Sequence, residues 1–276
     1  MARRIISASG KAGATPELGF ILGDAADPMA LAGSTAQVFL GLRVACAQCH
    51  DHPFDVWTRK DFYGLAAYFG KTRRVQSQFT NTVYTTEVDQ TTVLWPPAGV
   101  GEASDRKPMM PRFLFELDKG DRPSRPIARL KALRDRQARL AAAQVGPADG
   151  DAAVESLLNK AAKRAERRSS GRKTDKLGVA AEARRDARKL RISQARYRAS
   201  EFRTELARLI TSPRNRRFAT SFVNRVWGEL VGRGFVHPVD NFAESNPPSH
   251  PKTMNFLADE FIAAGYDLRS VVRVVV

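Results

Sequence analysis

Apolar residues at helical spacing predict two helices in the N-terminal third of the chain. Asp27 is a suitable N-cap for the first helix and Pro28 its first residue, and the pattern continues to about Val44. Thr58, with Asp61 three residues later, resembles the capping box that starts a helix. The first helix is therefore expected to end next to the cysteine cluster that follows it. The apolar face of the second helix consists of Phe62, Leu65, Ala66 and Phe69.

A different pattern follows, in which Val and Thr occur among polar residues from residue 79 to residue 95. This pattern predicts one or two strands or a hairpin. Prolines are frequent from Pro96 to Pro111, which predicts an irregular connector. We therefore expect the β structure of the chain to be one small element.

The C-terminal residues return to helical spacing. Ser249 is expected to cap a helix over residues 250–264, which Gly265 ends, and Asp267 is expected to start a last helix. An earlier helix is predicted to end at Gly232. The apolar stripe of that earlier helix consists of Phe218, Phe222, Val226 and Leu230, with Trp227 beside it.

Between these parts, residues 121–217 are rich in Ala, Arg and Lys, with sparse Leu and Ile. The segment has 27 Lys and Arg against 11 Asp and Glu, so it accounts for the whole formal net charge of +16. Long amphipathic helices, arranged as an antiparallel hairpin, are the expected structure. The predicted domains are a cysteine-cluster domain over 1–120, a basic helical insertion over 121–211 and a C-terminal helical domain over 212–276. The fold class is thus mainly α, with helical domains, a small β-hairpin element and an inserted long basic helical hairpin.

The composition of the chain allows a real hydrophobic core. With 276 residues and 43% hydrophobic content, the chain can build one large domain or two ordinary ones. It contains no run of about 18 apolar residues, so no transmembrane helix is predicted. The first residues include no apolar run of signal-peptide length, and the chain stops within an apolar stretch at Val276. We therefore expect a fragment that lacks both ends of a longer protein.

The most specific chemical motif is C-x-x-C-H, formed by Cys46, Cys49 and His50. One interpretation is c-type haem, with both cysteines as thioether anchors and His50 as axial ligand. A second is zinc or iron, bound by the cysteines and by His50 or His52. A third is a disulfide or dithiol. A reactive thiol is less favoured, because the cluster is expected at the C-terminal end of a helix, where the helix dipole does not stabilise a thiolate.

Two further groups of residues carry less specific chemistry. Met109 and Met110 are thioether donors in a Pro-flanked loop and are candidates for a sixth haem ligand, although methionine more often fills apolar gaps. Asp240, Asn246 and His250 lie in a turn-rich stretch and form a candidate loop site. Turn and helix-cap chemistry is the favoured explanation of that second group, because all its residue types are common in turns.

The basic segment, residues 121–217, suggests a partner of its own. Its Lys and Arg side chains could neutralise an acidic polymer or an anionic surface. Nucleic acid is not favoured, because the segment has few aromatic residues for base stacking and no recognised reading motif. A charged, solvated helical hairpin is the favoured interpretation.

Two long runs of the sequence carry a family resemblance. The run TAQVFLGLRVACAQCHDHPFDVWTRKDFYGLAAYF, from Thr35 to Phe69, resembles the second cytochrome-like domain of large planctomycete-type cytochrome proteins. The run from Ser212 to Arg273 resembles the domain of unknown function that follows it in those proteins. Both runs occur in the family's order.

The resemblance implies an exported c-type haem protein in which the family's cysteine-histidine motif falls on Cys46, Cys49, His50, His52, Pro53 and Phe54. It also places an acidic-turn motif on Asp240, although Asn241 stands where a second aspartate is usual. The expected function is haem binding for electron transfer or an associated oxidative step. The expected partner is a redox protein or a further haem domain, and the expected location is the periplasm or another extracytoplasmic compartment. The alternative is a non-catalytic interaction module with a structural metal site or disulfide.

Overall fold

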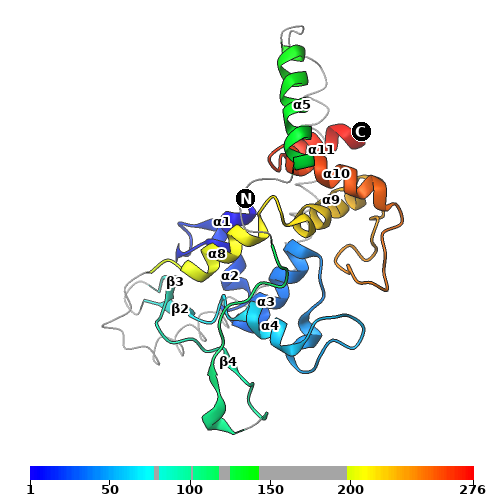
Figure 1. Cartoon of the computed structure of the whole chain (residues 1–276). Helices are drawn as coiled ribbons and strands as arrows, with labels where there is room; N and C mark the ends of the chain where they lie inside the picture. Colours follow the sequence, from blue (N-terminus) through cyan, green and yellow to red (C-terminus); the bar gives the residue numbers. More distant parts are fainter. Residues whose placement is uncertain (78–80, 101, 118–124, 143–197) are drawn as a thin grey trace. The chain divides into compact units, whose positions relative to one another are not determined.

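The chain forms two compact units in the computed structural model (Figure 1). The first unit contains the described residues up to Leu117 together with residues 198–211, and the second contains 125–142 and 212–276. Helices predominate in both units and the strands are short, which confirms the predicted mainly α class. The structure describes residues 1–77, 81–100, 102–117, 125–142 and 198–276.

The elements of each unit follow in chain order. The helical elements of the first unit are α1 (Ala2–Ser7), η1 (Pro16–Leu18), α2 (Gly19–Gly23), α3 (Pro28–Thr35), η2 (Ala36–Leu40), η3 (Ala45–Gln48), α4 (Arg59–Ala66), η4 (Ala103–Asp105) and α8 (Glu201–Ile210). Its strands are β1 (Gly10–Lys11), β2 (Thr72–Gln76), β3 (Val83–Glu87), β4 (Leu94–Trp95) and β5 (Lys107–Pro108). The second unit contains α5 (Arg125–Ala142), α9 (Arg216–Val231), α10 (Pro251–Ala263) and α11 (Leu268–Val275).

The start of α3 is as predicted, but its end is not. The Asp27 carboxylate accepts a hydrogen bond from the Ala30 N–H at 2.8 Å, and Pro28 is the first helical residue. The helix continues through the π-helical η2 and ends at Leu40, and the next residue, Gly41, has a left-handed φ of 70°. Glycine adopts this conformation without a steric penalty and commonly ends helices. The prediction of a helix to about Val44 is therefore wrong.

The second predicted helix, α4, is confirmed. Its N-terminus has the complete capping box, since the Thr58 hydroxyl accepts from the Asp61 N–H and the Asp61 carboxylate accepts from the Thr58 N–H. The predicted apolar face is buried, because each of its side chains is at most 1% exposed. These side chains are Phe62, Leu65, Ala66 and Phe69.

The small β element is also confirmed, but strands β1, β2 and β5 lie outside the predicted range 79–95, and β5 lies in the stretch predicted to be an irregular connector. Strands β2 and β3 pair antiparallel, with Thr72 opposite Glu87, and β1 joins the other edge of β3. Strand β2 is absent from the prediction because its sequence, Thr-Arg-Arg-Val-Gln, has no apolar alternation. Strands β4 and β5 form a separate two-stranded ribbon.

In the second unit the helix ends follow the predicted signals. Gly232, directly after α9, has a φ of 100°, and Gly265, two residues after the end of α10, has a φ of 68°. Asp267 caps α11. The predicted Ser249 cap is wrong. His250 occupies the N-cap position of α10 without a side-chain cap bond, and the Ser249 hydroxyl lies 3.1 Å from the ring Nδ1 of His250 instead.

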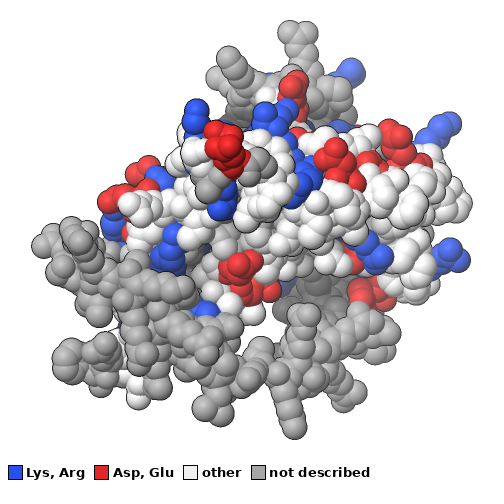
Figure 2. Space-filling view, turned by 90° about the horizontal axis from the view of Figure 1, so that it is seen from below, with Lys and Arg blue, Asp and Glu red and all other residues white. Residues whose placement is uncertain are grey.

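Most of the predicted basic hairpin falls on residues 143–197, which lie outside the described part of the chain. Of the described ends of this segment, α5 belongs to the second unit and α8 to the first. Helix α5 contacts α10 through an ion pair between Arg134 and Glu260, at 2.8 Å. On the face drawn in Figure 2, acidic and basic side chains of the described residues are interspersed. None of the described helices is long and apolar enough to cross a membrane.

Candidate functional site

The cysteine cluster begins on the short 3₁₀ turn η3. Ala47 is fully buried in this turn, and the Cys49 N–H donates to the Cys46 carbonyl at 3.3 Å. Cys46 and Cys49 are exposed free thiols. The turn is therefore anchored by its backbone and by one small apolar side chain, while both thiols face outward for chemistry.

The cluster does not lie at the C-terminal end of the preceding long helix. That helix ends at Leu40, and residues 41–44 separate it from η3. The predicted position is wrong, because Gly41 turns the chain before the cysteines are reached. The helix dipole acts only within the last turn of a helix, so it gives no reason to disfavour a dithiol here. A disulfide or dithiol at Cys46 and Cys49 stays an open alternative.

Backbone hydrogen bonds hold the loop that follows the cysteines. The Asp51 carboxylate accepts from the Arg59 N–H at 2.8 Å, at the first residue of α4. The His52 N–H donates to the Trp57 carbonyl, also at 2.8 Å. The Trp57 ring meets the Phe115 ring edge-on, with centroids 5.8 Å apart. These contacts tie the loop to α4 and to Phe115.

The two histidine rings of the cluster differ in their hydrogen bonds. The His50 Nδ1 lies 2.8 Å from the Asp51 carbonyl oxygen. A carbonyl can only accept, so Nδ1 carries the proton, and the Nε2 of the neutral ring keeps its lone pair. The His52 Nδ1 instead accepts from the Phe54 N–H at 3.3 Å, which places the proton of a neutral ring on Nε2. These bonds favour His50 over His52 as a ligand through Nε2.

The same loop also exposes large apolar side chains. Phe54 is 81% exposed and Val56 is 64% exposed. Both residues follow the thiols within ten positions of the sequence. The cysteine cluster is therefore followed by exposed apolar side chains.

The methionines proposed as a sixth ligand lie after β5. The Met109 N–H donates to the Val93 carbonyl at 3.0 Å, and the Met110 side chain is 71% exposed. Neither observation tests the ligand role, which stays a prediction.

The candidate loop site in the second unit is rich in turn contacts. The Asn246 amide donates to the carbonyls of Asn241 and His237, at 2.9 and 3.3 Å. Burial of the Arg225 guanidinium lowers its pKa below the usual arginine value, and the charge of Asp240 opposes this shift. His250 meets the Phe235 ring edge-on at 6.4 Å. These contacts give the loop a defined shape, and a binding role for it stays a prediction.

Sequence reasoning missed the residue that holds this loop, Asn224. It is fully buried in α9, and its side chain donates to the Val236 carbonyl and accepts from the Val236 N–H, both at 2.9 Å. No local signal marked Asn224, because it lies off the predicted apolar stripe, on a buried face of α9 that also includes Thr220 and Ser221. Within the described residues, no group of three or more His, Cys, Asp or Glu side chains is arranged to hold a metal ion.

These features define a mainly α protein with a structured, exposed C-x-x-C-H loop. Comparison with protein families places two matches on the chain. Residues 23–74 match the family model PSCyt2, described as a protein of unknown function (DUF1549), and this match contains the whole cysteine cluster. Residues 202–276 match the model PSD1, also a protein of unknown function (DUF1553). No curated protein and no solved structure matches the chain.

Proposed function

We propose that residues 46–50 attach a c-type haem, with Cys46 and Cys49 as thioether anchors and the His50 Nε2 as axial ligand. The observation that supports this proposal best is the bond from the His50 Nδ1–H to the Asp51 carbonyl, at 2.8 Å. Such a bond orients an imidazole and leaves Nε2 as the donor to a metal. The porphyrin supplies four nitrogens itself, so the protein needs to offer two accessible thiols and one imidazole. The described loop offers these groups.

Bound haem would supply one-electron chemistry. The function proposed for the protein is therefore electron transfer, or an associated oxidative step, with a redox protein or a further haem domain as partner. Haem attachment requires reduced thiols, so the reaction competes with disulfide formation in an extracytoplasmic compartment. The periplasmic location is part of the same proposal and is supported by the resemblance of residues 35–69 to cytochrome-like domains.

The test is expression of the chain, fused to an export signal, in a host that attaches haem. A pyridine haemochrome spectrum and the intact mass report covalent haem. We expect one haem per chain, none in the double variant Cys46→Ser/Cys49→Ser, and an altered axial-ligand spectrum or no haem in His50→Ala. His52→Ala is the matched control and should keep the wild-type haem content and spectrum. Folded wild-type protein with no covalent haem would exclude the proposal.

The alternative is an interaction module in which the cluster binds structural zinc or iron, or forms a disulfide. Metal analysis of the same preparations distinguishes the two proposals. Stoichiometric zinc without haem, lost on substitution of Cys46 or Cys49, would support the structural site. A mass lower by two hydrogens, restored on reduction, would support the disulfide.

The binding of an acidic polymer or anionic surface by residues 121–217 also stays a proposal. It is supported by the concentration of positive charge in that segment. Binding to a polyanion or to anionic vesicles should weaken steeply as salt is added, because counterion release drives such association. Binding that does not change with salt would exclude it.

A further inference from the structure

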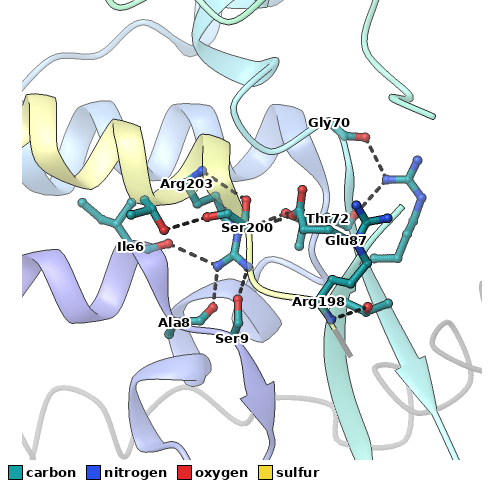
Figure 3. Close-up of polar contacts among 12 residues, drawn as sticks. Ile6, Ala8, Ser9, Gly70, Thr72, Glu87, Arg198, Ser200 and Arg203 are labelled. Carbon is teal, nitrogen blue, oxygen red and sulfur yellow. Dashed lines mark hydrogen bonds and ion pairs between the residues drawn. The ribbon is translucent and has the colours of Figure 1, made fainter. Parts of the chain in front are cut away.

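Arg203 is a fully buried arginine in α8 (Figure 3). Its guanidinium donates to the carbonyls of Ile6 and Ala8, at the end of α1, and to the Ser9 hydroxyl at 2.7 Å. A buried guanidinium is strongly destabilising unless its N–H donors are bonded and its charge is balanced. The residues around α1 are therefore arranged to receive this side chain.

The other side of the Arg203 guanidinium faces the sheet. Its Nε donates to the Thr72 hydroxyl of β2 at 3.0 Å, and that hydroxyl donates to the Glu87 carboxylate of β3 at 2.7 Å. The carboxylate lies 4.0 Å from the Arg203 Nε and balances its charge. One side chain of α8 thus joins α1, β2 and β3.

The contacts extend along the whole segment 198–211. Three apolar residues of α8 are fully buried, namely Leu206, Ala207 and Ile210. Polar and cation–π contacts join Arg198 to Thr86 and Asp89, Phe202 to Lys71, and Thr211 to Arg3. The surface that α8 covers is therefore built from α1, from β2 and β3, and from residues next to them.

The family matches and the compact units place α8 differently, because α8 lies in the PSD1 match but belongs to the first unit. The PSD1 match begins at residue 202 and includes most of α8, whereas the PSCyt2 match ends at residue 74. We infer that α8 is the segment by which the PSD1-matched region binds the first unit, the unit that contains the PSCyt2 match, and that this unit is not stable without α8. Residues 198–211 of the same chain cover the surface formed by α1, β2 and β3. This inference is independent of haem attachment.

The test uses the full chain and measures amide hydrogen exchange, segment by segment, in Arg203→Met. Loss of the guanidinium removes the buried charge beside Glu87 and the donors to the Ile6 and Ala8 carbonyls, so we expect exchange in α1, β2, β3 and α8 to accelerate at least about tenfold. Exchange in α9 and α10 should stay within about twofold of wild type. Arg208→Met is the matched control, because Arg208 lies on the same helix, but its side chain is 43% exposed and forms an ion pair with Glu205 at 2.8 Å.

Two outcomes would overturn the inference. One is faster exchange in α8 together with α9 and α10, while α1 and β3 keep their protection. The other is an effect of Arg203→Met no larger than that of Arg208→Met. If Arg203→Met does not accumulate as folded protein, Glu87→Gln provides the same test, since glutamine still accepts from Thr72 but lacks the charge. That variant must accelerate exchange in α1 and α8 relative to α9, or the inference fails.

Discussion

Replacement of Asn224 by alanine should destabilise the second unit by about 3–5 kcal/mol. Asn224 is fully buried in α9. Its Nδ2 donates to the carbonyls of Val236 and Val239, at 2.9 and 3.3 Å, and its Oδ1 accepts from the Val236 N–H at 2.9 Å. One side chain therefore holds the turn that leads into the loop carrying the candidate residues of this unit.

The magnitude follows from these three bonds. Two of the lost hydrogen bonds contribute about 1 kcal/mol net each, and loss of the third leaves a buried polar group without a partner, at a cost of about 1–3 kcal/mol. The Val236 N–H is such a group, because Val236 is 0% exposed. The sum is a large part of the roughly 5–15 kcal/mol that stabilises an ordinary domain.

The assay is urea unfolding followed by tryptophan fluorescence. Trp227 stacks on Phe235 with centroids 4.4 Å apart, so its emission reports on this turn. The other tryptophans, Trp57 and Trp95, are replaced by phenylalanine in all the proteins compared. The free energy of unfolding is then compared between the parent and the Asn224→Ala variant. The comparison requires that the slope of this free energy against urea concentration is the same in both proteins.

Asn246→Ala is the matched control. Asn246 also donates to two carbonyls, those of His237 and Asn241, but it is only half-buried, so water can replace its bonds. We expect a loss below about 1 kcal/mol for this variant. If Asn224→Ala is as mild as Asn246→Ala, the reasoning from buried hydrogen bonds is refuted.

Two further predictions concern a helix cap and a buried tyrosine. Asp27→Ala should lower the free energy of unfolding by about 1 kcal/mol, because its carboxylate caps α3, whereas Ser249→Ala should have little effect on α10. Equal losses in urea unfolding would contradict this. Burial, followed by the charge of Glu205, raises the pKa of Tyr68 from 10.0 to about 12. The unfolded chain therefore loses this proton first, so stability should fall as pH rises from 10 to about 12, and less so in Tyr68→Phe. Parallel urea midpoints for the two proteins over that range would contradict this.

Several helix ends could be predicted because their signals lie within one turn of chain. The carboxylates of Asp27 and Asp267 and the hydroxyl of Thr58 bond to N–H groups two or three residues ahead. Gly232 and Gly265 adopt left-handed conformations that other residues adopt at a cost. Gly41 is the same kind of signal, and the first helix ends just before it and not near Val44 as predicted.

The candidate site was predictable only in part. The spacing of Cys46, Cys49 and His50 indicated the chemistry, because C-x-x-C-H is a local pattern. The difference between His50 and His52 was not visible, because it depends on which backbone group each Nδ1 meets in the folded loop. The exposure of both thiols likewise required the structure.

The sequence by itself determined the helical class, the main caps and the cysteine motif, since each is encoded by neighbouring residues. Only the tertiary structure decided that Arg203 is buried and that α8 belongs to the first unit. In the sequence Arg203 is one of many arginines in a basic segment, where solvent exposure is the ordinary expectation. Its partners Ile6, Ala8 and Thr72 lie 131 to 197 residues away. Burial of a charge depends on partners brought together from such distances by packing, and no local pattern records them.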